Sequence, residues 1–191
     1  MEKQNKSDLR KKYLQKRDRI TPVARARDSA IIRQRVFGRP EWEDAHTILA
    51  YVSFRSEVET HKLIQEGLAQ KKRMVLPVID PATQEIHLSE LGAWGDLAPG
   101  VHGIYEPAAL FRKRVEPVEV ELVLVPGVAF DRKGGRLGLG GGYFDKLLVQ
   151  MPGAKRFGLA FSIQVRKSPL PMHDHDIHMQ AIITEKEVIT L

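Results

Sequence analysis

The residues best suited to chemistry lie in one glycine-rich segment, residues 136–145 (RLGLGGGYFD). Its four glycines fall within five positions, so backbone N–H groups can approach an anion without obstruction by side chains. Arg136 comes directly before them and offers a planar guanidinium that can bind phosphate oxygens in a bidentate manner. Asp145 follows them and is a carboxylate of the kind that holds magnesium beside phosphates. The segment therefore predicts a site for a phosphate-bearing ligand and Mg²⁺.

This segment matches neither of the familiar nucleotide-binding motifs. It lacks the Lys-Ser/Thr ending of the P-loop, and its glycines do not fit the GxGxxG spacing. A purely structural alternative is a long flexible turn whose glycines serve only the backbone geometry. The closeness of an arginine and an aspartate to the glycines favours the ligand site over this alternative.

The composition of the chain excludes several classes of protein. Of its 191 residues, 42% are hydrophobic and 28% are charged, as in ordinary globular proteins. The absence of cysteine excludes disulfide scaffolds, thiolate zinc sites and a cysteine nucleophile. No apolar run approaches the length of a membrane-spanning helix, and the charged N-terminus lacks the apolar core of a secretion signal. We therefore expect a soluble, cytoplasmic protein with no membrane partner.

Positive charge is concentrated near the N-terminus. Residues 1–39 hold 13 of the 30 basic residues and four of the 24 acidic ones, so the rest of the chain is mildly acidic. Such asymmetry indicates either a surface for nucleic acid or a helix that brings cations to a small polyanionic ligand. The expected strands are apolar and do not interleave basic with aromatic residues, which favours the small ligand.

The elements that must position these residues alternate between strand and helix. Two helices are expected in residues 1–39, the first capped by Ser7, the second begun by Thr21-Pro22 and ended by Gly38. Further helices are expected over 143–150 and after Thr60, which is the expected cap of its helix, and residues 92–118 are expected to be irregular. Short apolar runs predict strands at 47–53, 73–79, 86–91, 120–127, 156–162 and 180–184.

This order of elements predicts an α/β fold, namely a Rossmann-like open, mostly parallel sheet with helices on both faces. Open sheets of this kind bind ligands at the carboxyl ends of their strands, where the glycine-rich segment is expected to lie. We expect a single domain over residues 1–191, with the basic helices of residues 1–39 packed on it.

Two further groups have both a functional and a structural interpretation. Trp94 and Tyr105 could stack on a planar ligand or pack against neighbouring side chains. A polar cluster could bind a transition metal or form an ordinary loop, and its members are His173, Asp174, His175, Asp176 and His178.

The glycine-rich segment also carries a resemblance to a known family. Together with the preceding PGVAFD (residues 126–131) and Gly134-Gly135, it resembles the signature of the 5-formyltetrahydrofolate cyclo-ligases, also called methenyltetrahydrofolate synthetases. The resemblance covers almost the whole chain, since other family segments match in order. These are KSDLR (6–10), YVS (51–53), EVET (57–60), Leu76-Pro77, Glu106-Pro107 and His175-Asp176.

The resemblance implies a reaction. Members of the family convert 5-formyltetrahydrofolate to 5,10-methenyltetrahydrofolate while MgATP becomes ADP and phosphate. A formamide oxygen is a poor leaving group, so its phosphorylation to an iminophosphate prepares it to depart when the ring closes. Such chemistry asks the protein mainly for positioning and for cations around the γ-phosphate. Two alternatives stay open at this point, namely a paralogue that uses the same MgATP chemistry on another formamide, and a basic nucleic-acid-binding module.

The resemblance also implies roles for individual residues. Arg136 and Asp145 are implied as catalytic, Asp145 as the magnesium ligand, and Val52, Glu57 and Tyr143 as folate contacts. From the residues alone, Glu57 would be an ordinary acid near the start of a helix. The implied ATP contacts are Lys6, Arg10, Arg136, Leu137, Gly138, Leu139, Gly140, Gly141, Gly142, Tyr143 and Phe144.

One position departs from the family pattern. The family often has a second aspartate beyond the His-Asp pair, and this chain has Gln180 there. Whether Gln180 or Asp176 completes the magnesium shell therefore stays open. The expected ligands are a reduced folate and MgATP, with no nucleic-acid partner, and the expected state is a monomer.

Overall fold

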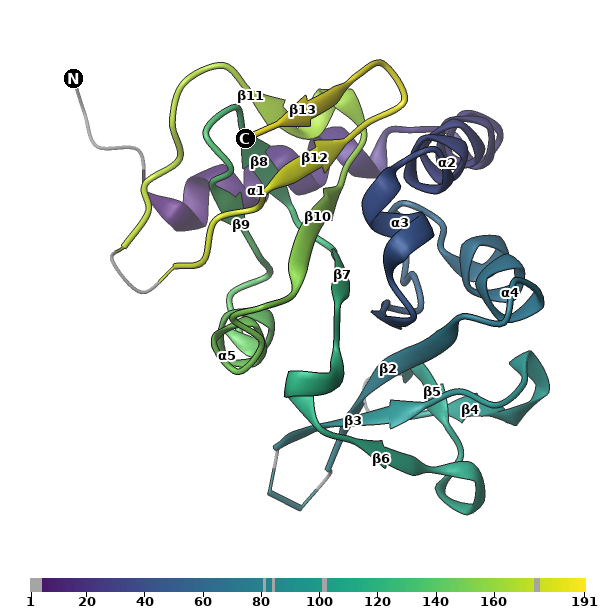
Figure 1. Ribbon diagram of the computed structural model, residues 1–191. Helices are drawn as coiled ribbons and strands as arrows, with labels where there is room; N and C mark the ends of the chain where they lie inside the picture. The colour runs from purple at the N-terminus through teal and green to yellow at the C-terminus, as the bar shows by residue number, and fades with distance from the viewer. Residues whose placement is uncertain (1–4, 81, 84, 101–102, 174–175) are drawn as a thin grey trace.

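The fold is built on an eight-stranded sheet with the order β13-β12-β10-β7-β1-β2-β3-β6 (Figure 1). The computed structural model describes residues 5–80, 82–83, 85–100, 103–173 and 176–191. The five strands from β12 to β2 are parallel, whereas β13, β3 and β6 pair in the antiparallel direction. The mostly parallel sheet confirms the expected α/β fold. The strands are β1 (Thr47–Leu49), β2 (Arg73–Ile79), β3 (Ile86–Glu90), β6 (Lys113–Val115), β7 (Leu122–Val125), β10 (Lys155–Leu159), β12 (Ala181–Ile183) and β13 (Val188–Thr190).

The side chains of β7 explain why both faces of the sheet are covered. Leu122 and Leu124 belong to the core on one face, under helices α2 (Pro22–Phe37), α3 (Pro40–Asp44) and α4 (His61–Ala69). Val123 and Val125 belong to the core on the other face, under helix α5 (Tyr143–Val149). Successive residues of a strand point to opposite faces, so a strand that is apolar throughout needs cover on both. The expected helices on both faces are confirmed.

A smaller sheet continues from the carboxyl end of β7. It has the order β11-β8-β9, formed by β11 (Val165–Arg166), β8 (Ala129–Asp131) and β9 (Arg136–Leu137). Helix α1 (Lys6–Asp18) lies against it, with Leu9 and Tyr13 packed in one apolar cluster with Val128 and Leu137. The sequence did not predict this sheet, and it places α1 beside the glycine-rich segment.

The helix ends follow ordinary capping chemistry, with one difference from expectation. Asn5, not Ser7, caps α1, because the helix begins at Lys6 and the Asn5 side chain accepts a hydrogen bond from the Ser7 N–H at 3.1 Å. Thr21 caps α2 and Gly38 ends it, as expected. Among the described residues, no helix is both long enough and apolar enough to cross a membrane.

Residues 92–118 hold more regular structure than expected. Strands β4 (Leu97–Pro99) and β5 (Tyr105–Pro107) form a two-stranded sheet, and β6 is an edge strand of the main sheet. Strands of three residues offer too few positions for alternation to show in the sequence. Short 3-10 turns lie beside them at η1 (Trp94–Asp96), η3 (Ala109–Phe111) and η4 (Pro117–Glu119), and another follows β10 at η5 (Ser162–Gln164). Conversely, the strands expected at 47–53 and 120–127 end early, at Leu49 and Val125.

Leu9 offers a test of how firmly α1 belongs to the fold. Leu9→Ala should lower the free energy of unfolding by about 2–4 kcal/mol, because the side chain is 2% exposed and its truncation leaves a cavity. Urea unfolding followed by circular dichroism measures this change. Leu110→Ala is the matched control: that leucine is 87% exposed, so the change should stay within about 0.5 kcal/mol. Equal stability of the two variants would show that α1 does not contribute to the core.

Candidate active site

A cleft of about 560 Å³ opens at the carboxyl ends of β1, β2 and β7. Tyr51 and Val52 line it just after β1, Pro77 near the end of β2, and Pro126 and Gly127 just after β7. Strand β1 pairs with β2 on one side and with β7 on the other, both in parallel. The strands that follow β1 in the chain are therefore added to the sheet first on one side of it and then on the other. Ligand sites of open α/β sheets lie at such a switch point.

The cleft gathers every residue that the family resemblance implied for ATP, folate and catalysis. They come from α1, from the segment after β1, and from the glycine-rich segment with the first turn of α5. The lining includes Lys6, Arg10, Val52, Glu57, Arg136, Leu137, Gly138, Leu139, Gly140, Gly141, Gly142, Tyr143, Phe144 and Asp145. A neighbouring groove of about 650 Å³, between β3, β6 and α5, shares Gly141, Tyr143 and Lys146 with it.

Arg136 and Asp145 form an ion pair, which the sequence did not predict. A terminal nitrogen of Arg136 lies 2.6 Å from Asp145 Oδ1, and the other terminal nitrogen donates to the Pro126 carbonyl at 3.3 Å. The Arg136 side chain is 4% exposed, whereas that of Asp145 is 29% exposed. Among the described residues, the buried Nε of Arg136 has no hydrogen-bond partner. The more exposed carboxylate of Asp145 thus holds the buried guanidinium of Arg136 in the lining of the cleft.

The glycines serve both backbone geometry and space. Gly140 and Gly142 have φ angles of +114° and +67°, which side chains strongly disfavour. A Cβ atom on Gly141 would lie 2.7 Å from the ring of Tyr143. The glycines therefore do serve the backbone geometry, which is one part of the structural alternative. The same glycines line the cleft, so their backbone is also open to a ligand.

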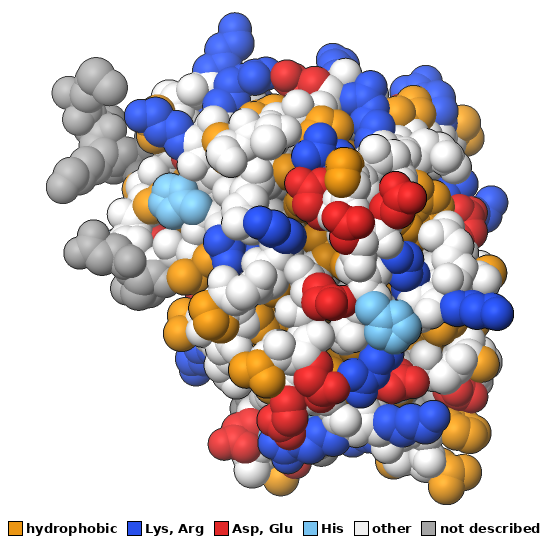
Figure 2. Space-filling view, viewed as in Figure 1, with side chains coloured by type: hydrophobic (Ala, Val, Ile, Leu, Met, Phe, Trp, Pro, Cys, Tyr) orange, Lys and Arg blue, Asp and Glu red, His pale blue; other side chains and the backbone are white. Residues whose placement is uncertain are grey.

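Helix α1 brings two cations to this segment. Arg10 Nε donates to the Gly138 carbonyl at 2.9 Å, and Lys6 Nζ lies 2.8 Å from Asp176 Oδ2. Lys6 and Arg10 lie four positions apart, so they share one face of the helix. Elsewhere the charges mix: on the described residues of the face in Figure 2, Lys and Arg side chains lie interspersed with Asp and Glu.

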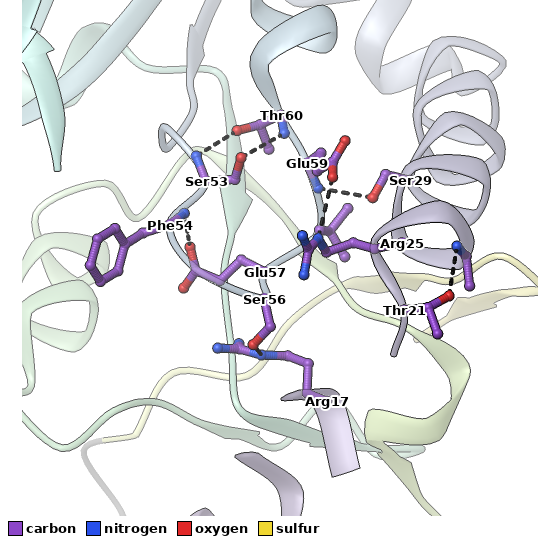
Figure 3. A network of polar contacts seen from close by, with 12 residues as sticks. Arg17, Thr21, Arg25, Ser29, Ser53, Phe54, Ser56, Glu57, Glu59 and Thr60 are labelled. Carbon is purple, nitrogen blue, oxygen red and sulfur yellow. Dashed lines mark hydrogen bonds and ion pairs between the residues drawn. The ribbon is translucent and has the colours of Figure 1, made fainter. Parts of the chain in front are cut away.

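The opposite wall carries Glu57 on a short loop after β1 (Figure 3). Its Oε2 accepts a hydrogen bond from the Phe54 N–H at 3.0 Å. Burial raises the pKa of Glu57, although this hydrogen bond and the charge of Arg17 act against the rise. Ser53 and Thr60 close the loop with reciprocal hydrogen bonds, so the Thr60 hydroxyl braces this loop and does not cap α4 as expected.

Arg17 is a cleft residue that the sequence analysis missed. It is 4% exposed, and it donates to Ser56 Oγ at 3.0 Å (Figure 3). It also donates to the Gly127 carbonyl at 3.3 Å. Its position, seven residues after Arg10 on the same helix, was the available signal. A run of basic residues on one helix does not reveal which of them is buried.

The polar cluster divides between the cleft and the surface. His173 and Asp176 line the cleft, whereas His178 Nδ1 lies 2.9 Å from the Lys133 carbonyl. Asp174 and His175 lie outside the described residues. Within the described part of the chain, no three His, Cys, Asp or Glu side chains gather as a metal site would require.

Gln180 does not face the cleft. Its side-chain oxygen accepts from the Arg156 N–H at 3.0 Å, near the amino end of β10 and thus at the opposite edge of the sheet. Of the two residues considered for the magnesium shell, only Asp176 is a cleft residue.

The two aromatic residues also differ. Tyr105 lines the cleft and is 51% exposed. Trp94 lies outside the lining and packs against the ring of His61, with centroids 5.2 Å apart. Next to Tyr105, the buried Glu106 of the matching Glu106-Pro107 segment also lines the cleft, where it accepts a hydrogen bond from Arg112 at 2.8 Å.

Comparison with known proteins agrees with this geometry. Residues 2–185 match the model of the 5-formyltetrahydrofolate cyclo-ligase family. The chain is 30% identical over 188 residues to the 5-formyltetrahydrofolate cyclo-ligase of Haemophilus influenzae, covering 96% of this chain and 99% of that protein. It is 29% identical over 177 residues to the corresponding Escherichia coli (strain K12) protein, covering 91% and 97%.

Solved structures give the same result. The NMR structure of Aquifex aeolicus 5,10-methenyltetrahydrofolate synthetase superimposes with a TM-score of 0.86 at 36% identity, covering 97% of this chain and 92% of that one. The synthetase of Mycoplasma pneumoniae shares the fold, with a TM-score of 0.75 at 24% identity over 95% and 99% of the chains. The signature in residues 126–145, the sheet and the family match agree, and the chain belongs to the 5-formyltetrahydrofolate cyclo-ligase family.

Proposed function

We propose that this protein converts 5-formyltetrahydrofolate and ATP to 5,10-methenyltetrahydrofolate, ADP and phosphate in the cleft described above. The observation that carries the proposal is the meeting of three groups in one cleft. Cations from α1 and the glycine-rich segment line one part of it, and a buried carboxylate on the loop after β1 lines another. One part suits a triphosphate and the other suits a ring with N–H donors.

The reaction requires two bond exchanges. The formyl oxygen attacks the γ-phosphorus of ATP, the bond from that phosphorus to the bridging oxygen breaks, and ADP leaves. The neighbouring folate nitrogen then attacks the formyl carbon, the carbon–oxygen bond breaks, and phosphate leaves as the nitrogen loses its proton. Both exchanges depend on alignment and on compensation of phosphate charge more than on covalent help from the protein.

The phosphate side falls to Lys6, Arg10 and Arg136. Arg136 is held in a fixed direction by Asp145 and the Pro126 carbonyl, so its charge need not reorganise during transfer. Lys6 and Arg10 contact Asp176 and the Gly138 carbonyl, and both stand where phosphate oxygens could replace or extend these contacts. In the proposed site, residues 137–144 contact the nucleotide through their backbone.

Asp145 is the proposed magnesium ligand, with Asp176 as a second carboxylate at the cleft. Magnesium is usually held in proteins by one or two carboxylates together with phosphate oxygens and water, and these oxygens fit that donor set. Bound there, the ion would neutralise charge on the β- and γ-phosphate oxygens. Asp145 would then serve both the ion and Arg136.

Glu57 is the proposed acceptor for the N–H donors of the pterin ring. Its Oε2 is used by Phe54, and among the described residues Oε1 has no hydrogen-bond partner. Val52 and Tyr143 add an apolar wall and an aromatic ring to the same cleft. A buried carboxylate with one oxygen available suits a planar ring with adjacent donors.

The direct experiment follows product formation. The purified protein, given 5-formyltetrahydrofolate and MgATP, should form the absorbing methenyl product with one ADP released per product. Omission of ATP should abolish the product. Formation of ADP without methenyl product would contradict the proposal and point to another acceptor for the phosphoryl group.

Asp145→Asn tests the magnesium role. Turnover should fall at least about 10–100-fold, and higher magnesium should restore part of the rate because a weakened site fills by mass action. Arg136→Lys is the comparison variant: it keeps the charge but loses the fork, so its higher KM for ATP should not respond to magnesium. Normal turnover of Asp145→Asn across a magnesium titration would refute the assignment.

Glu57 predicts a pH dependence of folate binding. The carboxylate accepts from two donors only when ionised, so affinity is full above its folded-state pKa and falls, by up to about tenfold per pH unit, below it. Because burial raises the pKa of Glu57, this loss should begin at a higher pH than an exposed glutamate would give. Calorimetric titration with 5-formyltetrahydrofolate at several pH values measures it.

Two variants complete that test. Glu57→Gln should bind the folate more weakly at neutral pH and should lack the acid-side loss. Glu59→Gln is the matched control, because Glu59 is two residues away, pairs with Arg25 and does not line the cleft. A Glu57→Gln variant with the wild-type pH profile would refute the placement of the pterin at Glu57.

A further inference from the structure

Arg17 is a buried charged residue that the proposed chemistry does not use. Among the described residues, no carboxylate lies within ion-pair distance of it, and its hydrogen bonds go to one hydroxyl and one carbonyl. Burial of a charge is costly unless its hydrogen bonds are met, so this arrangement is not a casual product of packing. The question is what the two contacts hold together.

The first contact holds the loop that carries Glu57. Ser56 Oγ accepts from Arg17 Nε at 3.0 Å (Figure 3). It also donates to the Asp18 carboxylate, so two successive residues at the end of α1 bind one hydroxyl. Glu57 is the next residue, and its Cα therefore lies about 3.8 Å from that of Ser56. Whatever fixes Ser56 fixes the start of the Glu57 side chain.

The second contact holds the exit of the central strand. Arg17 donates to the Gly127 carbonyl, which also accepts from Gln164 Nε2 at 2.8 Å. Gly127 follows the end of β7 by two residues and leads into the small sheet under α1. Arg17 thus bridges the loop after β1 and the segment after β7, the two walls of the cleft at its switch point.

We propose that Arg17 is a positioning residue that sets Glu57 at the correct place for the folate. This inference rests on the proposed placement of the pterin at Glu57. The same helix carries Arg10, and seven residues of helix rise about 10 Å. Through Arg17, α1 fixes the separation between the phosphate cations at its start and the folate carboxylate beyond its end.

The test separates positioning from general support of the fold. Arg17→Lys keeps the positive charge but cannot reach both Ser56 and Gly127 with one planar fork. Its Kd for 5-formyltetrahydrofolate, measured by calorimetry, should rise about tenfold or more, while its Kd for MgATP should change by less than about threefold. Lys6→Ala should show the opposite pattern.

Arg156→Lys is the matched control. Like Arg17, Arg156 donates two hydrogen bonds from its guanidinium, here to the carbonyls of His178 and Ala154, but it lies at the opposite end of the strands. It should leave both Kd values at the wild-type level even if its melting temperature falls as much as that of Arg17→Lys. If Arg17→Lys does not fold, Ser56→Ala is the second variant, and the same folate-selective loss is expected.

Several outcomes would overturn the inference. If Arg17→Lys and Ser56→Ala weaken the binding of folate and of MgATP equally, the role of Arg17 is merely structural. If neither variant weakens folate binding, Arg17 does not position Glu57. If Glu57→Gln weakens folate binding but the two variants do not, only the role of Arg17 fails. If Glu57→Gln leaves folate binding unchanged, the proposed pterin site fails and this inference fails with it.

Discussion

The site depends on one physical constraint, namely that a buried guanidinium needs oxygens around it. Arg136 meets this constraint at its two terminal nitrogens, with Asp145 and the Pro126 carbonyl, whereas its buried Nε has no partner among the described residues. Arg136 precedes the glycines and Asp145 follows them, so their ion pair joins the two ends of the glycine-rich segment. The Pro126 carbonyl, which lies before the small sheet, holds the other terminal nitrogen. The segment between can then be made of glycine, because its path is fixed from its ends and not by its own side chains. A freely directed arginine would give neither a fixed loop nor a fixed phosphate contact.

Helix α1 is the second organising element. Its apolar face, with Leu9 and Tyr13, packs on the small sheet, and its charged residues Arg10 and Arg17 reach into the cleft from the same side. An amphipathic helix usually separates these duties, with apolar residues inward and charges outward. Here the cleft lies along the boundary between the two faces. Arg10 and Arg17, on that boundary, form hydrogen bonds with other parts of the chain, whereas Lys11 and Lys12, on the outer face of the helix, are exposed to solvent.

The sequence predicted the main features for identifiable reasons. Strand β7 is apolar at every position, and the glycine-rich segment has a composition that few structures require, so both are strong signals. The small sheet β11-β8-β9 was missed because two of its strands have only two residues each. The Asp131 side chain holds the turn between β8 and β9 and also accepts from the distant Leu170 N–H. The expected cap, Ser7, was wrong by two positions, because serine and asparagine both cap helices well and the sequence does not show which of them precedes the first turn.

Parts of the site lay beyond the reach of one sequence. The helical spacing of Arg17 from Arg10 is a weak local signal, because its burial depends on contacts with Ser56 and Gly127, which are 39 and 110 positions away. The ion pair of Arg136 with Asp145 depends on how the glycines bend the chain. The position of Gln180 became clear only when β10 and β12 were paired. Long-range contacts decided each case.

The separation of α1 from its partners has a consequence for how the protein forms. Arg10 contacts the Gly138 carbonyl across 128 positions, and Lys6 contacts Asp176 across 170. During synthesis from the N-terminus, α1 leaves the ribosome long before the surface that it covers exists. Its 13 residues are too few for a stable isolated helix, so the segment acquires its packing only after the strands of the main sheet are made. The cleft is therefore one of the last parts of the molecule to assemble, and binding competence and completion of the chain arrive together.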